Sequence, residues 1–163
     1  MRRYSPNSTN EHKMKKHLIY LALIASAVPA MAQDKSRVVP ADAVVWRAHP
    51  LFVGAQIATL VGDPTKPETI VQRFKYPPNF KVAPHTHSYT EVATVVSGTL
   101  GYGEGDTFDT AKGVLLKAGS VFVFPGTPAH YVWTTTEETI VQFVFTGPAG
   151  IVFRNPADDP RKK

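Results

Sequence analysis

The fold is decided by two stretches, NFKVAPHTHSYTEVATVVSG at residues 79–98 and GSVFVFPGTPAH at residues 119–130. The first stretch places His85 and His87 two residues apart, so both imidazoles lie on one face of an extended strand. Glu91 follows four residues after His87, and a local turn or bulge can bring its carboxylate to the same point. Three side chains that bind metals therefore come from one short segment.

A third histidine, His130, ends the second stretch after a proline-containing turn. With His85, His87 and Glu91 it makes a set of three imidazoles and one carboxylate, which suits a single divalent ion such as Fe, Mn, Zn, Ni or Cu. Four protein ligands around an octahedral ion leave positions for water or substrate, so the ion could act as a Lewis acid or bind oxygen. Glu91 could instead contact the metal ligands without binding the ion itself, or it could act as a general base.

The rest of the chain has the pattern of an all-β protein. Turn-forming residues recur about every 8–12 residues, and no amphipathic helix pattern is found between residues 40 and 155. No internal repeat is visible, so we expect one barrel. Short apolar or β-branched runs predict strands over residues 43–49, 56–61, 68–76, 89–96, 99–102, 114–116, 121–124, 130–135, 139–145 and 151–153.

The basic charge is concentrated at the N-terminus. Lys and Arg number 18 against 13 Asp and Glu, a formal net charge of +5. Residues 1–32 hold five of these bases and one acid, so the rest of the chain has 13 bases against 12 acids. A nearly neutral body without a basic stripe argues against a nucleic-acid partner. The chain has no cysteine, which excludes disulfides and thiolate ligands.

The segment MKKHLIYLALIASAVPAMA, residues 14–32, has the features of a secretory signal. Two lysines precede the apolar run 18–28, and small residues precede a predicted cleavage after Ala32. The apolar run is too short for a transmembrane anchor, which needs about 20 residues. We expect residues 1–32 to be an N-terminal extension and signal peptide, whether translation starts at Met1 or Met14. The mature protein would then be periplasmic or secreted, without a membrane partner.

The two stretches resemble the paired motifs of the cupin superfamily, with HxH, three residues, Glu, six residues, Gly, and then Gly, five residues, Pro, four residues, His. Asn79 replaces the opening glycine of the first motif, and it also tolerates a positive φ. Thr127 and Thr134 replace a glycine and an asparagine of the second. The resemblance implies a single jelly-roll (cupin) β-barrel over residues 43–155, with an irregular C-terminal tail over residues 156–163, and a homodimer.

Three further turns, GDPTKP near Asp63, GDTFD near Asp106 and NPADDP near Asn155, are similar to a subgroup of small cupins. That subgroup includes the cupin domain of a plant protein named for DNA-damage repair and toleration. Cupins include dioxygenases, isomerases, lyases, sugar-binding regulators and storage proteins, so the fold does not fix the function. We carry two hypotheses: a metal-dependent enzyme acting on a small molecule, dioxygenase- or isomerase-like, and a non-catalytic binding or sensing module.

Five other residues have open or minor roles. His49 has no partner in the pattern and is expected to be an ordinary histidine at a strand end. Tyr89 could line the pocket or only pack. Thr134 follows His130 by four residues, so it is expected on the same strand face and could point into the barrel. Trp133 alternates to the other face and is expected to pack outside the barrel or in a dimer contact. Gln142 is either exposed on a solvated face or a donor in the pocket.

Overall fold

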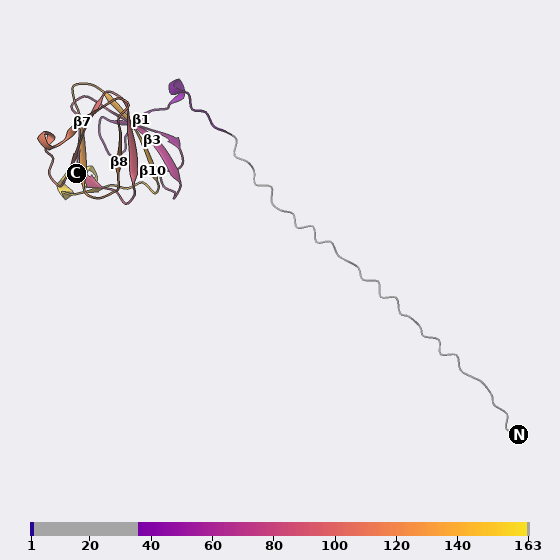
Figure 1. Cartoon of the computed structure of the whole chain (residues 1–163). Coiled ribbons are helices and arrows are strands. Elements are labelled where there is room, and N and C mark those ends of the chain that lie inside the picture. The colour runs from indigo at the N-terminus through magenta and orange to yellow at the C-terminus, as the bar shows by residue number, and fades with distance from the viewer. Residues whose placement is uncertain (2–35, 163) are drawn as a thin grey trace. The chain divides into compact units, whose positions relative to one another are not determined.

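The structure is a computed structural model that describes Met1 and residues 36–162 (Figure 1). The chain divides into two units, Met1–Ser36 and Arg37–Lys163, and every strand belongs to the second. The predicted signal peptide lies outside the described residues. In the part of the chain that is described, no helix has the length and apolar character needed to cross a membrane.

Residues 36–162 fold into β-strands and short 3-10 turns, without an α-helix in that range. Their bounds are β1 (Arg47–Ala48), β2 (Gln56–Val61), β3 (Thr69–Tyr76), β4 (Lys81–Thr86), β5 (Glu91–Ser97), β6 (Thr99–Glu104), β7 (Val114–Lys117), β8 (Val121–Phe124), β9 (His130–Thr134), β10 (Thr139–Thr146) and β11 (Val152–Phe153), with turns η1 (Ala41–Ala43), η2 (Thr110–Lys112), η3 (Pro156–Asp158) and η4 (Pro160–Lys162).

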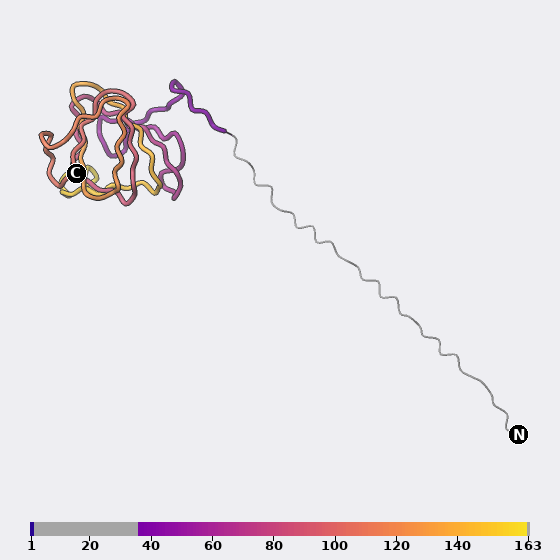
Figure 2. Tube along the Cα trace, in the orientation of Figure 1, coloured from indigo at the N-terminus to yellow at the C-terminus, as the bar shows by residue number. Residues whose placement is uncertain are grey.

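The strands form two antiparallel sheets. One has the order β1-β2-β3-β10-β5-β8 and the other the order β11-β4-β9-β6-β7. The chain passes back and forth between them, since β3 and β5 belong to the first sheet and β4 and β6 to the second, a path that can be followed in Figure 2. This winding is that of a jelly roll. The predicted all-β jelly-roll fold is confirmed.

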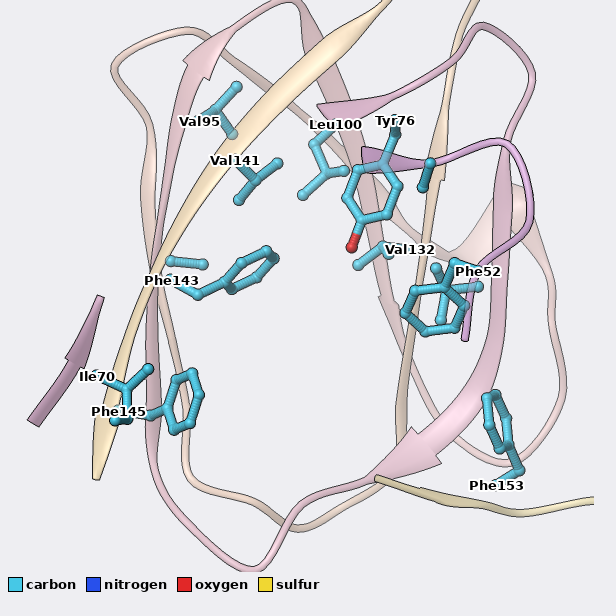
Figure 3. Packing of buried hydrophobic residues seen from close by; sticks show 13 residues of the cluster. Phe52, Ile70, Tyr76, Val95, Leu100, Val132, Val141, Phe143, Phe145 and Phe153 are labelled. Carbon is cyan, nitrogen blue, oxygen red and sulfur yellow. The ribbon is translucent and has the colours of Figure 1, made fainter. Parts of the chain in front are cut away.

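The two sheets bury alternate residues between them. Along β10 the buried residues Val141, Phe143 and Phe145 alternate with half-buried ones, as the period of two in a strand requires. Figure 3 shows Phe143, Phe145, Tyr76 and Phe52 arranged around an open centre. All four residues also line a cavity, so this part of the core forms a wall around it.

Gln142 and Trp133, whose roles the sequence left open, both lie on the outer faces of the sheets. Gln142 points away from the interior and its Oε1 accepts a hydrogen bond of 3.0 Å from Arg73 Nε, so it is not a pocket donor. Trp133 packs outside β9, where its indole covers Gly101 so closely that a Cβ there would overlap the ring. Its edge meets Phe108 at 6.0 Å between ring centroids. Trp133 is thus part of the packing of its own chain.

Two predictions about the first strand and the C-terminal tail were wrong. A strand was predicted over 43–49, but only Arg47–Ala48 pairs with β2, and Ala41–Ala43 form a turn of 3-10 helix. The run AVVW is apolar, yet Val45 remains exposed because no strand or side chain covers it on that edge. The tail is not irregular, since η3 and η4 order it, and the Asn155 side chain caps η3.

The strand β4 was not among the strands predicted from apolar runs, although an extended strand was expected at His85 and His87. Its sequence KVAPHT contains Pro84, and proline is normally absent from the interior of a sheet because it lacks an N–H group. The β4–β9 ladder accommodates it by shifting register between Val82 and His85. The carbonyl of Pro84 still accepts a hydrogen bond from Arg154 N. The irregularity thus lies directly before the first histidine of the HxH pair.

Candidate metal centre

The structure brings three of the four predicted ligands into one cluster. His85 in β4 and His130 in β9 are directly paired across the two strands, and His87 follows the end of β4. One ligand atom from each of the three imidazoles lies within 4.8 Å of those of the other two. His85 and His130 are only 4% and 3% exposed. The cluster therefore sits inside the barrel.

Hydrogen bonds fix the form of two of these imidazoles. Nδ1 of His85 lies 2.7 Å from the carbonyl of Ala83, and Nδ1 of His87 lies 2.6 Å from the carbonyl of Gly150. A carbonyl oxygen only accepts, so each Nδ1 carries the proton and each Nε2 keeps its lone pair. A metal-binding histidine is commonly oriented in this way by a backbone carbonyl.

The electrostatics keep all three imidazoles neutral. Burial lowers the pKa of His85 to about 3 and that of His130 to about 2, and it also lowers the pKa of His87. Neighbouring imidazoles lower the pKa of His85 and His130 further. Neutral imidazole is the form that binds a metal ion.

Glu91 lies beside the cluster and outside the group of three. It begins β5, is 6% exposed, and its Oε2 is 4.0 Å from Nε2 of His87. Burial raises the pKa of its carboxyl group to about 8. A carboxyl group held there without a cation is therefore mostly protonated at neutral pH.

The residues present fit a metal ion. Nδ1 of His130 is the only buried side-chain nitrogen or oxygen without a hydrogen-bond partner in the described residues. Buried polar atoms are almost always paired, so this imidazole is incompletely satisfied by the protein. Its ring faces those of His85 and His87 at centroid distances of 4.1 and 5.4 Å. Three neutral imidazoles with a carboxylate nearby form a donor set that divalent transition metals accept.

The turn before β4 is held by two residues, Asn79 and Thr134, that replace a glycine and an asparagine of the family motifs. Asn79, which precedes β4, has a φ of 58°, in the left-handed region. Thr134 is buried at the far end of β9, where its Oγ1 accepts from Phe80 N at 2.8 Å and donates to the carbonyl of Pro77 at 2.6 Å. Its hydroxyl thus fixes the turn before β4 and does not reach the cluster.

The three imidazoles and Glu91 line a cavity of about 520 Å³ within the barrel. Most of the wall is apolar and aromatic, including the rings Phe52, Phe74, Tyr76, Phe143 and Phe145, four of which are labelled in Figure 3. A cavity of this volume suits a small molecule. The three-histidine cluster thus opens onto a space large enough for a small molecule.

A model of the family described as Cupin matches residues 66–151, more than half of the chain. The chain belongs to the cupin family. None of the curated proteins matches the sequence. Both motif stretches overlap this region, and all four predicted ligands fall within it.

Solved structures with a similar fold come from several kinds of protein. The polyketide cyclase RemF from Streptomyces resistomycificus is 16% identical, with a TM-score of 0.64, and the match covers 78% of this cupin and 92% of RemF. KdgF from Halomonas sp. is 18% identical, with a TM-score of 0.56 and coverage of 71% and 96%. At these identities the similarity shows the fold alone.

Tyr89 both lines the cavity and packs. Its ring stacks on His87 with 5.0 Å between centroids and on Phe145 with 4.5 Å. Its hydroxyl donates to the carbonyl of Gly150 at 3.2 Å, the same carbonyl that orients His87. Tyr89 therefore helps to hold the His87 imidazole in place and forms part of the wall.

The sequence did not identify the other polar residues of the cavity. Arg47, His49, Gln72 and Arg161 line it. His49 follows the end of β1, as predicted, but it also lines the cavity, which the sequence did not indicate. The spacing of Arg47 and His49 at i and i+2 could have indicated a shared face. Gln72 sits in the apolar pattern of β3, where its amide donates to Thr59 Oγ1 at 3.0 Å.

Proposed function

We propose that this cupin holds one divalent metal ion with His85, His87, Glu91 and His130 and is a metal-dependent enzyme acting on a small molecule. The observation that carries the proposal is the cluster of three neutral imidazoles at the wall of a largely apolar cavity of about 520 Å³. A purely structural metal site would have no need of that cavity. When bound, a divalent ion supplies a Lewis acid, and a redox-active one also supplies electron transfer.

The protein's own residues would have three tasks. His85 and His87 present their Nε2 lone pairs in orientations fixed by backbone carbonyls. The carboxyl group of Glu91 would lose its proton when it joins the ion, because only the carboxylate is a ligand. The aromatic wall would exclude water from the bound molecule. We place the reaction class among dioxygenase-like and isomerase-like chemistry, as the neutral nitrogen-rich ligand set allows both.

We also propose that the protein is exported and forms a homodimer. The signal-like sequence of residues 14–32 supports export to the periplasm or the medium. The edge strand β8 and its neighbour β5 support the dimer, because they carry a row of exposed valines on the outer face. An open edge strand with an apolar face is a usual place for strands of two chains to pair. The valines are Val92, Val96, Val121 and Val123.

A substrate panel on the purified, metal-loaded protein tests the enzyme proposal. Product formation and oxygen uptake are followed under air and under nitrogen for wild type, His87→Ala and Gln142→Ala. We expect turnover in wild type and in Gln142→Ala, whose side chain lies on the outer face, and loss of both metal and turnover in His87→Ala. Saturable binding without any product would favour a non-catalytic binding module. Full activity of metal-free protein would contradict the proposal.

A further inference from the structure

A second polar group of the cavity lies away from the metal ligands, on β1 and directly after it. Arg47 pairs with Ile57 across the β1–β2 ladder, and residues directly opposite in a ladder share a face of the sheet. Arg47, His49 and Ile57 all line the cavity. The strands β2, β3 and β10 separate β1 from β5, which begins with Glu91. The cavity thus has polar groups on two separate parts of its wall.

His49 is held in one orientation and one tautomer. Its Nδ1 accepts hydrogen bonds from Leu51 N at 3.1 Å and Phe52 N at 3.0 Å, so the proton of the neutral ring is on Nε2. The ring stacks on Phe52 at 4.6 Å and meets the edge of Phe74 at 4.7 Å. Within residues 36–162 no group accepts from Nε2–H. A fixed donor is therefore left for a molecule in the cavity.

Arg47 adds a positive charge that no described residue neutralises. Its side chain is exposed while it lines the cavity, so it stands at the mouth, and no carboxylate of residues 36–162 forms an ion pair with it. The other arginine of the wall, Arg161, is held by Asp159 through contacts of 2.8 and 2.9 Å. Glu91 is the only acidic residue of the described wall. The mouth is therefore suited to an anion.

We propose that the cavity selects molecules with a carboxylate and an apolar body, and that Arg47 and Nε2–H of His49 bind the carboxylate at the mouth. Both groups only donate, they lie two residues apart in the sequence, and two donors match the two oxygens of a carboxylate. The aromatic wall, which includes Phe74 and Phe143, accommodates the apolar body. This inference rests on the proposed function, because it names the class of substrate for the same cavity.

The test compares an acid with its neutral amide. Binding of 4-fluorobenzoate and of 4-fluorobenzamide to the metal-loaded protein is measured by fluorine NMR titration, and it is repeated after the metal has been removed with a chelator. We expect Arg47→Gln to weaken 4-fluorobenzoate about tenfold, the effect of one lost charged hydrogen bond. Binding of the amide should change less than twofold. Lys117→Gln, which removes one positive charge on β7 outside the cavity wall, should change neither.

A second readout tests His49 without replacing it. The imidazole nitrogens are observed by long-range proton–nitrogen NMR, and the Nε2–H tautomer is expected, with a shift of its signal on addition of 4-fluorobenzoate. No preference for the acid over the amide, or equal binding by wild type and Arg47→Gln, overturns the inference. Failure of the proposed metal function is a separate result, because the Arg47 comparison in metal-free protein does not depend on a metal.

Discussion

The buried carboxyl group of Glu91 predicts how many protons are released when a metal binds. Burial raises its pKa from 4.5 to about 8 in the metal-free protein. A group with that pKa is about nine-tenths protonated at pH 7 and about one-quarter protonated at pH 8.5. A carboxylate must lose this proton to become a ligand. Binding of one Mn²⁺ should therefore release about 0.9 proton from Glu91 at pH 7 and about 0.25 proton at pH 8.5.

The histidines should add little to this release. Burial lowers the pKa of His85 to about 3 and that of His130 to about 2, so at pH 7 these two imidazoles carry no extra proton. Burial also lowers the pKa of His87, which favours its neutral form at pH 7. The affinity for the ion should consequently rise as the pH rises towards 8. The stability of the metal-free protein should change in the opposite direction and fall as the pH rises. The raised pKa of Glu91 contributes to the stability of the folded state fully below pH 4.5, and this contribution is lost as the pH rises through about 8.

Isothermal titration calorimetry measures the release directly. Metal-free protein is titrated with Mn²⁺ at pH 7 and 8.5 in buffers of different ionisation enthalpy, and the dependence on the buffer gives the number of protons. Glu91→Gln is the matched control, since it keeps the shape of the side chain but has no proton to lose. The reasoning would be refuted by equal release from wild type and Glu91→Gln at pH 7, because Glu91 would then not join the ion as a carboxylate.

Three other changes test the packing, the turn before β4 and the proposed dimer. Gly101→Ala should lower the free energy of unfolding in urea by about 2–3 kcal/mol, because the new methyl group overlaps the indole of Trp133; an unchanged midpoint would contradict this packing. Thr134→Val should cost about 1–3 kcal/mol, since the Phe80 N–H loses its partner, and a smaller loss would mean that water replaces the hydroxyl. Val123→Lys should convert a dimer into a monomer in light scattering, whereas an unchanged mass would exclude this face as the interface.

The cluster of three histidines was predictable because the spacing of its residues matches the two cupin motifs. Alternation along a strand places His85 and His87 on one face. The pairing of His130 with His85 across the ladder does not follow from alternation and was expected from the motif resemblance. Glu91 was assigned from its distance along the chain to His87, and the structure places the two side chains 4.0 Å apart. Asn79 was expected to tolerate a positive φ, and its φ of 58° confirms this.

The mouth of the cavity and the edges of the sheets were not predictable in the same way. Extended backbone was expected at His85 and His87, but the full length of β4 was missed because Pro84 is a poor strand residue, which a shift in the register of the ladder accommodates. β1 is shorter than its apolar run because an edge strand extends only as far as it pairs with its single neighbour. Here only Arg47 and Ala48 pair with β2. The role of His49 depends on two backbone N–H groups of the following loop, and no residue pattern specifies those.

The metal content of the purified protein tests the central claim most directly. The protein is prepared without chelators or added metal, and the metals are counted by mass spectrometry in wild type and in His87→Ala. The account predicts about one divalent ion per chain in wild type and its loss in the variant. Wild-type protein that holds no ion, even after incubation with Fe²⁺, Mn²⁺ and Zn²⁺, would contradict the account.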